Sequence, residues 1–153
     1  MNTEVFRFGE FALTIVSNGT AVTDIIRGDA ACDGETDAVT HYAADELSAY
    51  FSGRLREFST PVELTSGVTD FQHRVWCELR EIPFGEVASY GEIARRVGKP
   101  GAARAVGNAV GANPILIMVP CHRVVASTGI GGFSSGLDLK QFLLRTEGIY
   151  GAI

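Results

Sequence analysis

The spacing of apolar residues in the first third of the chain predicts a hairpin followed by a helix. Two runs rich in β-branched residues over 11–28 flank Asn18 and Gly19, a residue pair typical of tight β-hairpin turns. Apolar residues then recur at helical spacing over 41–55, where Gly53 marks the expected end of the helix. This part of the chain is therefore predicted to form a small antiparallel sheet with one helix.

Helical spacing dominates the remainder of the chain. Residues 59–69 are rich in turn formers and are expected to be a linker. The elements predicted after it are helices over 70–82, 89–97 and 102–113, a buried strand or extended run over 114–120, a Gly-rich loop over 129–136 and a helix over 137–148. Ser89 and Glu92 form a capping box. The four-residue turn 98–101 joins this capped helix to the next one, so the pair is a helix-turn-helix candidate.

These elements predict an α+β fold with two domains. The chain has 153 residues, enough for two small domains, each with a core of its own. The first domain, residues 1–66, is expected to combine the short antiparallel sheet with one helix. The second, residues 67–153, is expected to be mainly helical and to carry the helix-turn-helix.

Composition indicates a folded protein, because 46% of the residues are apolar and 20% are charged. No uncharged apolar stretch is long enough to span a membrane, and the N-terminus has acids where a signal peptide has a basic flank. A cytoplasmic protein is expected. Residues 1–66 hold four basic and eleven acidic side chains, a net charge of −7, whereas residues 67–153 hold nine and seven, a net charge of +2. The second domain is therefore suited to meet phosphate.

The three cysteines, Cys32, Cys77 and Cys121, do not form a disulfide framework, because their number is odd and their spacings are wide. The cysteines and histidines also lack common zinc-binding patterns, so no metal site is expected. Cys32 lies in an acidic loop and is expected to be exposed, whereas Cys77 is expected to pack in the core beside Trp76. Cys121 is the cysteine with candidate chemistry.

Cys121 is followed directly by His122, which can act as a base or an ion partner for the thiol. Neighbouring side chains on a strand point to opposite faces, so contact between the two requires a bend, which Pro120 is placed to supply. Glu147, in the last helix, can orient the imidazole and complete a cysteine–histidine–acid relay. Because free cysteines are commonly buried and inert, these residues alone leave open whether Cys121 is structural or a nucleophile.

The second helix of the helix-turn-helix, 102–113, consists mostly of Ala, Gly and Val, with Arg104 and Asn108 as its strong polar side chains. A helix that reads bases in the major groove usually presents more polar side chains. Gly107 and Gly111 each cost about 1 kcal/mol relative to Ala inside a helix, so a compensating close approach is expected. Two interpretations stand: a slim face that enters a DNA minor groove, or a helix packed tightly in the core.

Several of these motifs together resemble the O6-alkylguanine-DNA alkyltransferases, the methylated-DNA–protein-cysteine methyltransferases. The resemblance is carried by the AARAVG helix, Asn113-Pro114, VPCHRVV over 119–125, the Gly-rich loop and Glu147-Gly148. It is strong over 71–148 and fair over 46–65. It implies that the second domain is a winged-helix-like DNA-binding domain with a helix-turn-helix, which holds the alkyltransferase site.

The resemblance implies DNA repair by direct reversal. The protein would bind double-stranded DNA through the minor groove, flip out an O6-alkylguanine and transfer its alkyl group irreversibly to Cys121, once per molecule. O4-alkylthymine is a further candidate substrate. Glu147, His122 and a water molecule would take up the thiol proton, and Asn113 would shape the pocket and hold its loop.

The resemblance also assigns contacts with DNA and with the flipped base. Arg104 would occupy the gap in the base stack, and Tyr90 would press on the 3′ phosphate. The other residues placed at the DNA are Ala103, Gly107, Asn108 and Arg123, and those placed at the base are Val124, Phe133, Ser134 and Lys140. A monomer is implied, with no cofactor, no metal, no membrane and no obligate protein partner.

The sequence departs from the family pattern at Phe133, where tyrosine is usual, so a hydroxyl contact with the substrate would be lost. Alkyltransferase-like proteins, which only flag lesions, replace the reactive cysteine, and Cys121 argues against that role. Two alternatives remain. A non-catalytic helix-turn-helix binder predicts that Cys121→Ala keeps the biological effect, and a thiol hydrolase using Cys121, His122 and Glu147 predicts turnover of an ester or amide.

Overall fold

The structure is a computed structural model that describes residues 1–29, 34–64 and 68–150. The chain divides into two compact units. One comprises Met1–Thr65 with Pro114–Met118, and the other comprises Ser66–Asn113 with Val119–Ile153. Within the described ranges, no helix is both long and apolar enough to cross a membrane. Cys32, which was predicted to be exposed, lies outside these ranges.

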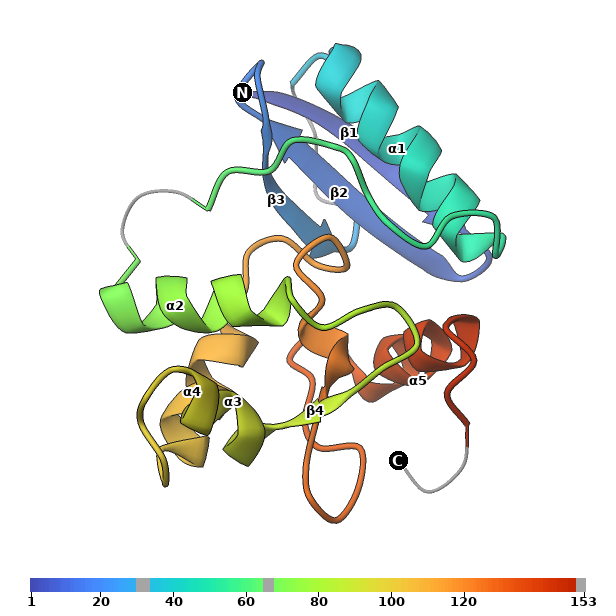
Figure 1. The fold of residues 1–153 in the computed structure, drawn as a ribbon. Coiled ribbons are helices and arrows are strands. Elements are labelled where there is room, and N and C mark those ends of the chain that lie inside the picture. Colours follow the sequence, from blue (N-terminus) through green and yellow to red (C-terminus); the bar gives the residue numbers. More distant parts are fainter. Residues whose placement is uncertain (30–33, 65–67, 151–153) are drawn as a thin grey trace. The chain divides into compact units, whose positions relative to one another are not determined.

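The first unit is a three-stranded antiparallel sheet covered by one helix. Its elements are β1 (Asn2–Phe8), β2 (Phe11–Ser17), β3 (Val22–Arg27) and α1 (Ala38–Phe51), with the strands in the order β1-β2-β3. Figure 1 shows α1 lying along one face of the sheet, and fully buried Leu13, Ile15, Ile25, Leu47 and Tyr50 contribute to the core. The predicted sheet and helix are confirmed, but β1 was not predicted.

The predicted hairpin is formed by β2 and β3, and Asn18 closes its turn. The side-chain Oδ1 of Asn18 accepts hydrogen bonds from the backbone N–H groups of Thr20 and Ala21, both at 3.0 Å. Gly19 has a φ of 97°, a conformation that a residue without Cβ adopts without strain. Asn18 and Gly19 therefore form the hairpin turn, as expected.

Helix α1 begins earlier than the predicted 41–55. Asp37 is its N-cap, since its carboxylate accepts the backbone N–H of Thr40 at 2.7 Å, and the Thr40 hydroxyl accepts the Asp37 N–H at 2.9 Å. The prediction missed this start because Asp and Thr at these positions form an unusual version of the capping box. The helix ends at Phe51, and Gly53 follows with a φ of 77°, close to the predicted stop.

The stretch predicted as a linker, 59–69, is in part a component of the first unit. The buried carboxylate of Glu46 accepts hydrogen bonds from the backbone N–H groups of Ser59, at 3.0 Å, and Thr60, at 2.7 Å. Val62 then pairs with Val22 in a parallel bridge at the sheet edge. A buried carboxylate in α1 thus fixes the chain after the helix, which the turn-rich composition did not indicate.

The predicted strand at 114–120 is wrong for most of its length. Ile115 forms one bridge with Ile25, but the chain then folds into a turn in which the N–H of Met118 donates to the carbonyl of Leu116 at 2.8 Å. Ile117, at the centre of this turn, has a φ of 73°, which is rare for a β-branched residue. The apolar run correctly predicted burial, but it cannot distinguish a buried strand from a buried turn.

The second unit contains the predicted helix-turn-helix. Its elements are α2 (Asp70–Leu79), β4 (Ala88–Ser89), α3 (Tyr90–Arg96), α4 (Ala103–Gly111), the 3-10 helix η1 (Cys121–Arg123), β5 (Val124–Val125) and α5 (Leu137–Thr146). Helices α2, α3 and α4 pack against one another (Figure 1). The predicted capping box is present, since Ser89 Oγ accepts the Glu92 N–H at 3.1 Å.

Helix α2 packs through Val75, Trp76 and Leu79, and the indole Nε1–H of Trp76 donates to the Ala109 carbonyl of α4 at 2.8 Å. Cys77 is exposed, so its predicted place in the core is wrong. Successive helical residues are turned by about 100°, and Cys77 thereby leaves the buried face that its neighbour Trp76 occupies.

The Glu46 contacts predict a stability effect. Glu46→Gln replaces a carboxylate that accepts two backbone N–H groups with an amide, so we expect a loss of about 2 kcal/mol in the free energy of unfolding. Urea unfolding followed by circular dichroism measures it. The matched control is Glu57→Gln at an exposed position, which should change the free energy by less than about 0.5 kcal/mol. Equal stability of both variants would contradict the assignment.

Candidate active site

The segment that carries Cys121 is held beside the start of α3 by a short parallel pair. Strand β5 pairs with β4 in the register Ala88–Val124 and Ser89–Val125. Cys121 itself opens the 3-10 helix η1, and its N–H donates to the Val119 carbonyl at 2.8 Å across Pro120. The predicted bend at Pro120 is therefore present, and Cys121, His122 and Arg123 project around a tight turn instead of alternating along a strand.

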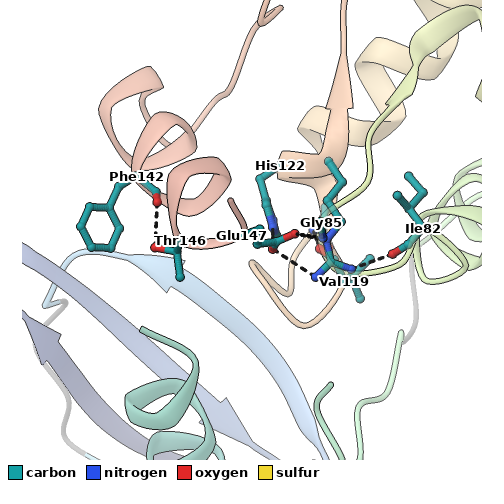
Figure 2. Close-up of polar contacts among 9 residues, drawn as sticks. Ile82, Gly85, Val119, His122, Phe142, Thr146 and Glu147 are labelled. Carbon is teal, nitrogen blue, oxygen red and sulfur yellow. Dashed lines mark hydrogen bonds and ion pairs between the residues drawn. The ribbon is translucent and has the colours of Figure 1, made fainter. Parts of the chain in front are cut away.

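A buried carboxylate lies at the centre of the site. His122 Nε2 lies 2.6 Å from Glu147 Oε2, and both side chains are fully buried. Arg123 donates to both oxygens, with Nε 2.8 Å from Oε1 and Nη2 3.1 Å from Oε2. The backbone N–H of Gly85 donates to Oε1 at 3.1 Å, and Arg123 Nη1 donates to the Ile82 carbonyl at 2.7 Å. Figure 2 shows Gly85 beside the His122–Glu147 pair and Ile82 at the far end of the same run of contacts.

These contacts determine which members of the network carry charge. Burial alone would raise the pKa of Glu147, but the hydrogen bonds from His122 and Arg123 and the positive charge of Arg123 outweigh it and lower that pKa to about 2. Burial lowers the pKa of His122 below its ordinary value, and the opposing effect of Glu147 does not reverse this. Near neutral pH the network therefore contains an ionised Glu147, a charged Arg123 and a neutral His122.

Cys121 is only 3% exposed, and burial raises its pKa to about 11. A hydrogen bond from Asn113 and the charge of Lys140 act in the opposite direction. Asn113 also ties the end of α4 to the residues before the thiol, because its Nδ2 donates to the Val119 carbonyl at 2.8 Å. Cys121 is a thiol at neutral pH, so a reaction through sulfur needs a base, and the neighbouring imidazole is one.

Lys140 is fully buried and holds the loop after β5. Its Nζ donates to the carbonyls of Val124, at 2.7 Å, and Gly132, at 3.0 Å. Burial lowers its pKa to about 8. The Phe133 ring lies 5.9 Å from Nζ, and the fully buried Val124 contributes its carbonyl to this cluster. Two of the four residues predicted at the base, Phe133 and Lys140, are thus close together.

Tyr90, the first residue of α3, contacts the Gly-rich loop. Its hydroxyl donates to the Gly132 carbonyl at 3.4 Å, and a Cβ on Gly131 would come within 3.0 Å of its ring. The Gly-rich loop is also linked to α4, because the Ser134 hydroxyl donates to the carbonyl of Gly111 at 3.2 Å. The start of α3, the end of α4 and the loop beside Cys121 are therefore connected within one unit.

The exposed face of α4 is nearly free of large side chains. Arg104 and Asn108 are exposed, Ala103 is half-buried, and Val106, Ala109 and Val110 pack inward. A Cβ on Gly111 would meet nothing within 4 Å, and one on Gly107 would meet the Tyr90 ring at 3.8 Å, an ordinary contact. The described residues therefore do not make the expected close approach to either glycine.

One predicted DNA contact requires correction. Arg123 is 7% exposed, and its guanidinium is bound to Glu147 and to the Ile82 carbonyl, so it cannot present its charge to phosphate. The sequence analysis also did not identify the two backbone groups of this network, the Gly85 N–H and the Ile82 carbonyl. Gly85, with a φ of 84°, sits in a turn whose conformation favours glycine, and this turn signal was the available indication.

Among the residues that the structure describes, no group of three or more His, Cys, Asp and Glu side chains is arranged to hold a metal ion. The fold and the site together define a class of protein: a helix-turn-helix unit that encloses a thiol beside an imidazole–carboxylate pair.

Comparisons with known proteins agree with this class. Residues 70–149 match the family model of the 6-O-methylguanine DNA methyltransferase DNA-binding domain. A methylated-DNA–protein-cysteine methyltransferase of Methanosarcina acetivorans is 52% identical over 69% of this chain and 67% of its own length. A relative of the same name from Mycolicibacterium paratuberculosis is 54% identical over 69% of this chain and 63% of its own. The crystal structure of Mycobacterium tuberculosis OGT in complex with DNA is similar to this structure, with a TM-score of 0.86 and 41% identity over 96% of this chain and 92% of that one.

The family model covers more than half of the chain, so the chain belongs to the 6-O-methylguanine DNA methyltransferase family. The resemblance inferred from the PCHRV and AARAVG motifs is confirmed. The matched segments span about two-thirds of the length of the two relatives.

Burial predicts that the thiols differ in reactivity. Iodoacetamide added to the native protein at neutral pH should modify exposed Cys77 and modify Cys121 at least about tenfold more slowly, because Cys121 is buried and its pKa is about 11. Peptide mapping by mass spectrometry distinguishes the sites, and labelling in urea provides the reference for full access. Equal labelling of both thiols in the native protein would contradict the site described above.

Proposed function

We propose that this protein repairs DNA by direct reversal, moving the alkyl group of an O6-alkylguanine in duplex DNA to Cys121. The observation that carries the proposal is the buried thiol of Cys121, whose neighbour in the sequence, His122, pairs with the buried Glu147 in the unit that contains the helix-turn-helix. Membership of the methyltransferase family supports the same chemistry. O4-alkylthymine is a second substrate under this proposal.

The reaction is a displacement at the alkyl carbon. A bond forms between Cys121 Sγ and that carbon while the bond from the carbon to guanine O6 breaks. His122 takes the thiol proton, directly or through a water molecule, and the guanine gains a proton as it leaves. The thioether product has no leaving group for hydrolysis, so each molecule reacts once. No cofactor takes part in this sequence.

DNA binding is assigned to residues 67–153, the alkyltransferase domain, with residues 1–66 as a separate N-terminal domain. The small exposed face of α4 enters the minor groove, where Gly107 and Ala103 permit close approach and Asn108 supplies a polar contact. Arg104 is exposed and fills the space that the flipped base leaves, while Tyr90 presses on the neighbouring phosphate.

The flipped base is assigned to the space beside the Gly-rich loop. Phe133 stacks on it, Ser134 and the Val124 backbone border it, and Lys140 holds the two carbonyls that shape the loop. Asn113 fixes the chain before the thiol. The protein is assigned to the cytoplasm, where it acts as a monomer without an obligate protein partner.

The experiment that tests this function is the intact mass of the protein after incubation with a duplex that contains one O6-methylguanine. We expect each molecule to gain one methyl group, mapped to Cys121, and Cys121→Ala to gain none. An unmethylated duplex is the control for adventitious modification.

Two other outcomes would replace the proposal. Tight lesion binding without any mass change would indicate a lesion-recognition protein, in which Cys121 is structural. Repeated turnover of an ester or amide, lost in Cys121→Ala, would indicate a thiol hydrolase.

A further inference from the structure

We infer that Arg123 is a positioning residue of this site: its guanidinium fixes the Glu147 carboxylate and keeps the His122 imidazole in the neutral form that accepts the thiol proton. The inference rests on the proposed alkyl transfer. It gives Arg123 a role inside the protein in place of the DNA contact expected from the sequence.

The geometry of Arg123 is that of a two-point clamp. Its Nε and Nη2 lie 2.8 Å and 3.1 Å from the two Glu147 oxygens, and its Nη1 donates to the Ile82 carbonyl at 2.7 Å. Such a planar, bidentate pair restrains both the position and the rotation of the carboxylate, which a lysine ammonium cannot do equally well. The guanidinium therefore anchors Glu147 to the turn that contains Ile82.

The same geometry specifies the state of His122. A carboxylate only accepts hydrogen bonds, so the 2.6 Å contact with Glu147 Oε2 places a hydrogen on His122 Nε2. In a neutral imidazole, Nδ1 then carries the lone pair and is the basic atom. Because Glu147 holds Nε2, the proton from Cys121 can be accepted at Nδ1.

A carboxylate beside an imidazole normally favours the imidazolium, which cannot accept another proton. The charged and titratable groups around His122 are Cys121 and Arg123 from η1, and Glu147 and Lys140 from the last helix and its C-cap. Glu147 raises the pKa of His122, whereas burial and the charges of Arg123 and Lys140 lower it. Helix α2 also contacts η1, and its buried residues are the uncharged Val75, Trp76 and Leu79. Tyr90, at the start of α3, is a further titratable group that interacts with Cys121.

In the resting protein, the charge of Arg123 thus counteracts the effect of the Glu147 charge on the pKa of His122. Glu147 can still stabilise the imidazolium once the proton has been transferred, because the hydrogen bond to Nε2 is already formed. Without Arg123, the carboxylate would attract a proton onto His122 before the reaction. The base would then be lost at mildly acidic and neutral pH.

The test compares Arg123→Gln, which removes the charge, with Arg123→Lys, which keeps it. The measured quantity is the pH at half-maximal rate of single-turnover transfer on the acidic side. The Gln variant should move it upward by about one pH unit or more, the scale of a neighbouring unit charge. The Lys variant should keep it near the wild-type value. Arg145→Gln, an identical change at an exposed position of α5, is the matched control.

A purely structural role predicts lower stability with an unshifted midpoint in Arg123→Gln, and that result would overturn the inference. Because the Gln variant may fail to fold, NMR of the His122 ring nitrogens in the wild-type protein gives a second test. At neutral pH we expect a neutral ring with its hydrogen on Nε2, and an imidazolium would overturn the inference. This measurement needs no DNA, so it separates failure of the inference from failure of the proposed alkyl transfer.

Discussion

The site depends on one buried carboxylate. Glu147 closes the C-terminal end of α5 and accepts hydrogen bonds from a histidine, an arginine and a backbone N–H of the turn before β4. A buried charge is costly unless it is paired and hydrogen-bonded, and removing one partner typically costs about 3–5 kcal/mol. The carboxylate therefore both requires its partners and fixes them, and the position of the His122 imidazole follows from that requirement.

Burial keeps Cys121 in the thiol form, which reacts slowly. A thiol with a pKa of about 11 does not react appreciably with passing electrophiles, which suits a group that is consumed in one reaction. Under the proposed function, its activation comes with the substrate, through His122 and the nearby charge of Lys140. The Gly-rich loop is linked to the end of α4 through Ser134 and Gly111, so the proposed DNA contacts and base contacts would lie on connected elements.

Local sequence patterns predicted most helices and turns, whereas features that depend on contacts between distant residues were missed. The Asn18-Gly19 turn and the Ser89–Glu92 capping box could be predicted because each is settled by residues two or three apart. The turn at Ile117 could not, since it is set by packing, whereas the exposure of Cys77 follows from the helical spacing and was misjudged from its neighbour Trp76. His122 and Glu147 were paired correctly, 25 residues apart, through chemical reasoning. Arg123 was misplaced because its sequence position reveals its charge but not its burial.

The most direct test of this account is the single-turnover rate of methyl transfer by Glu147→Gln, compared with the wild-type protein at neutral pH. Circular dichroism first establishes that the variant is folded at the assay temperature. If the carboxylate organises the base, the rate should fall by roughly a hundredfold, the scale of general-base assistance. A folded variant that transfers the methyl group to Cys121 at the wild-type rate would contradict the central role assigned to Glu147.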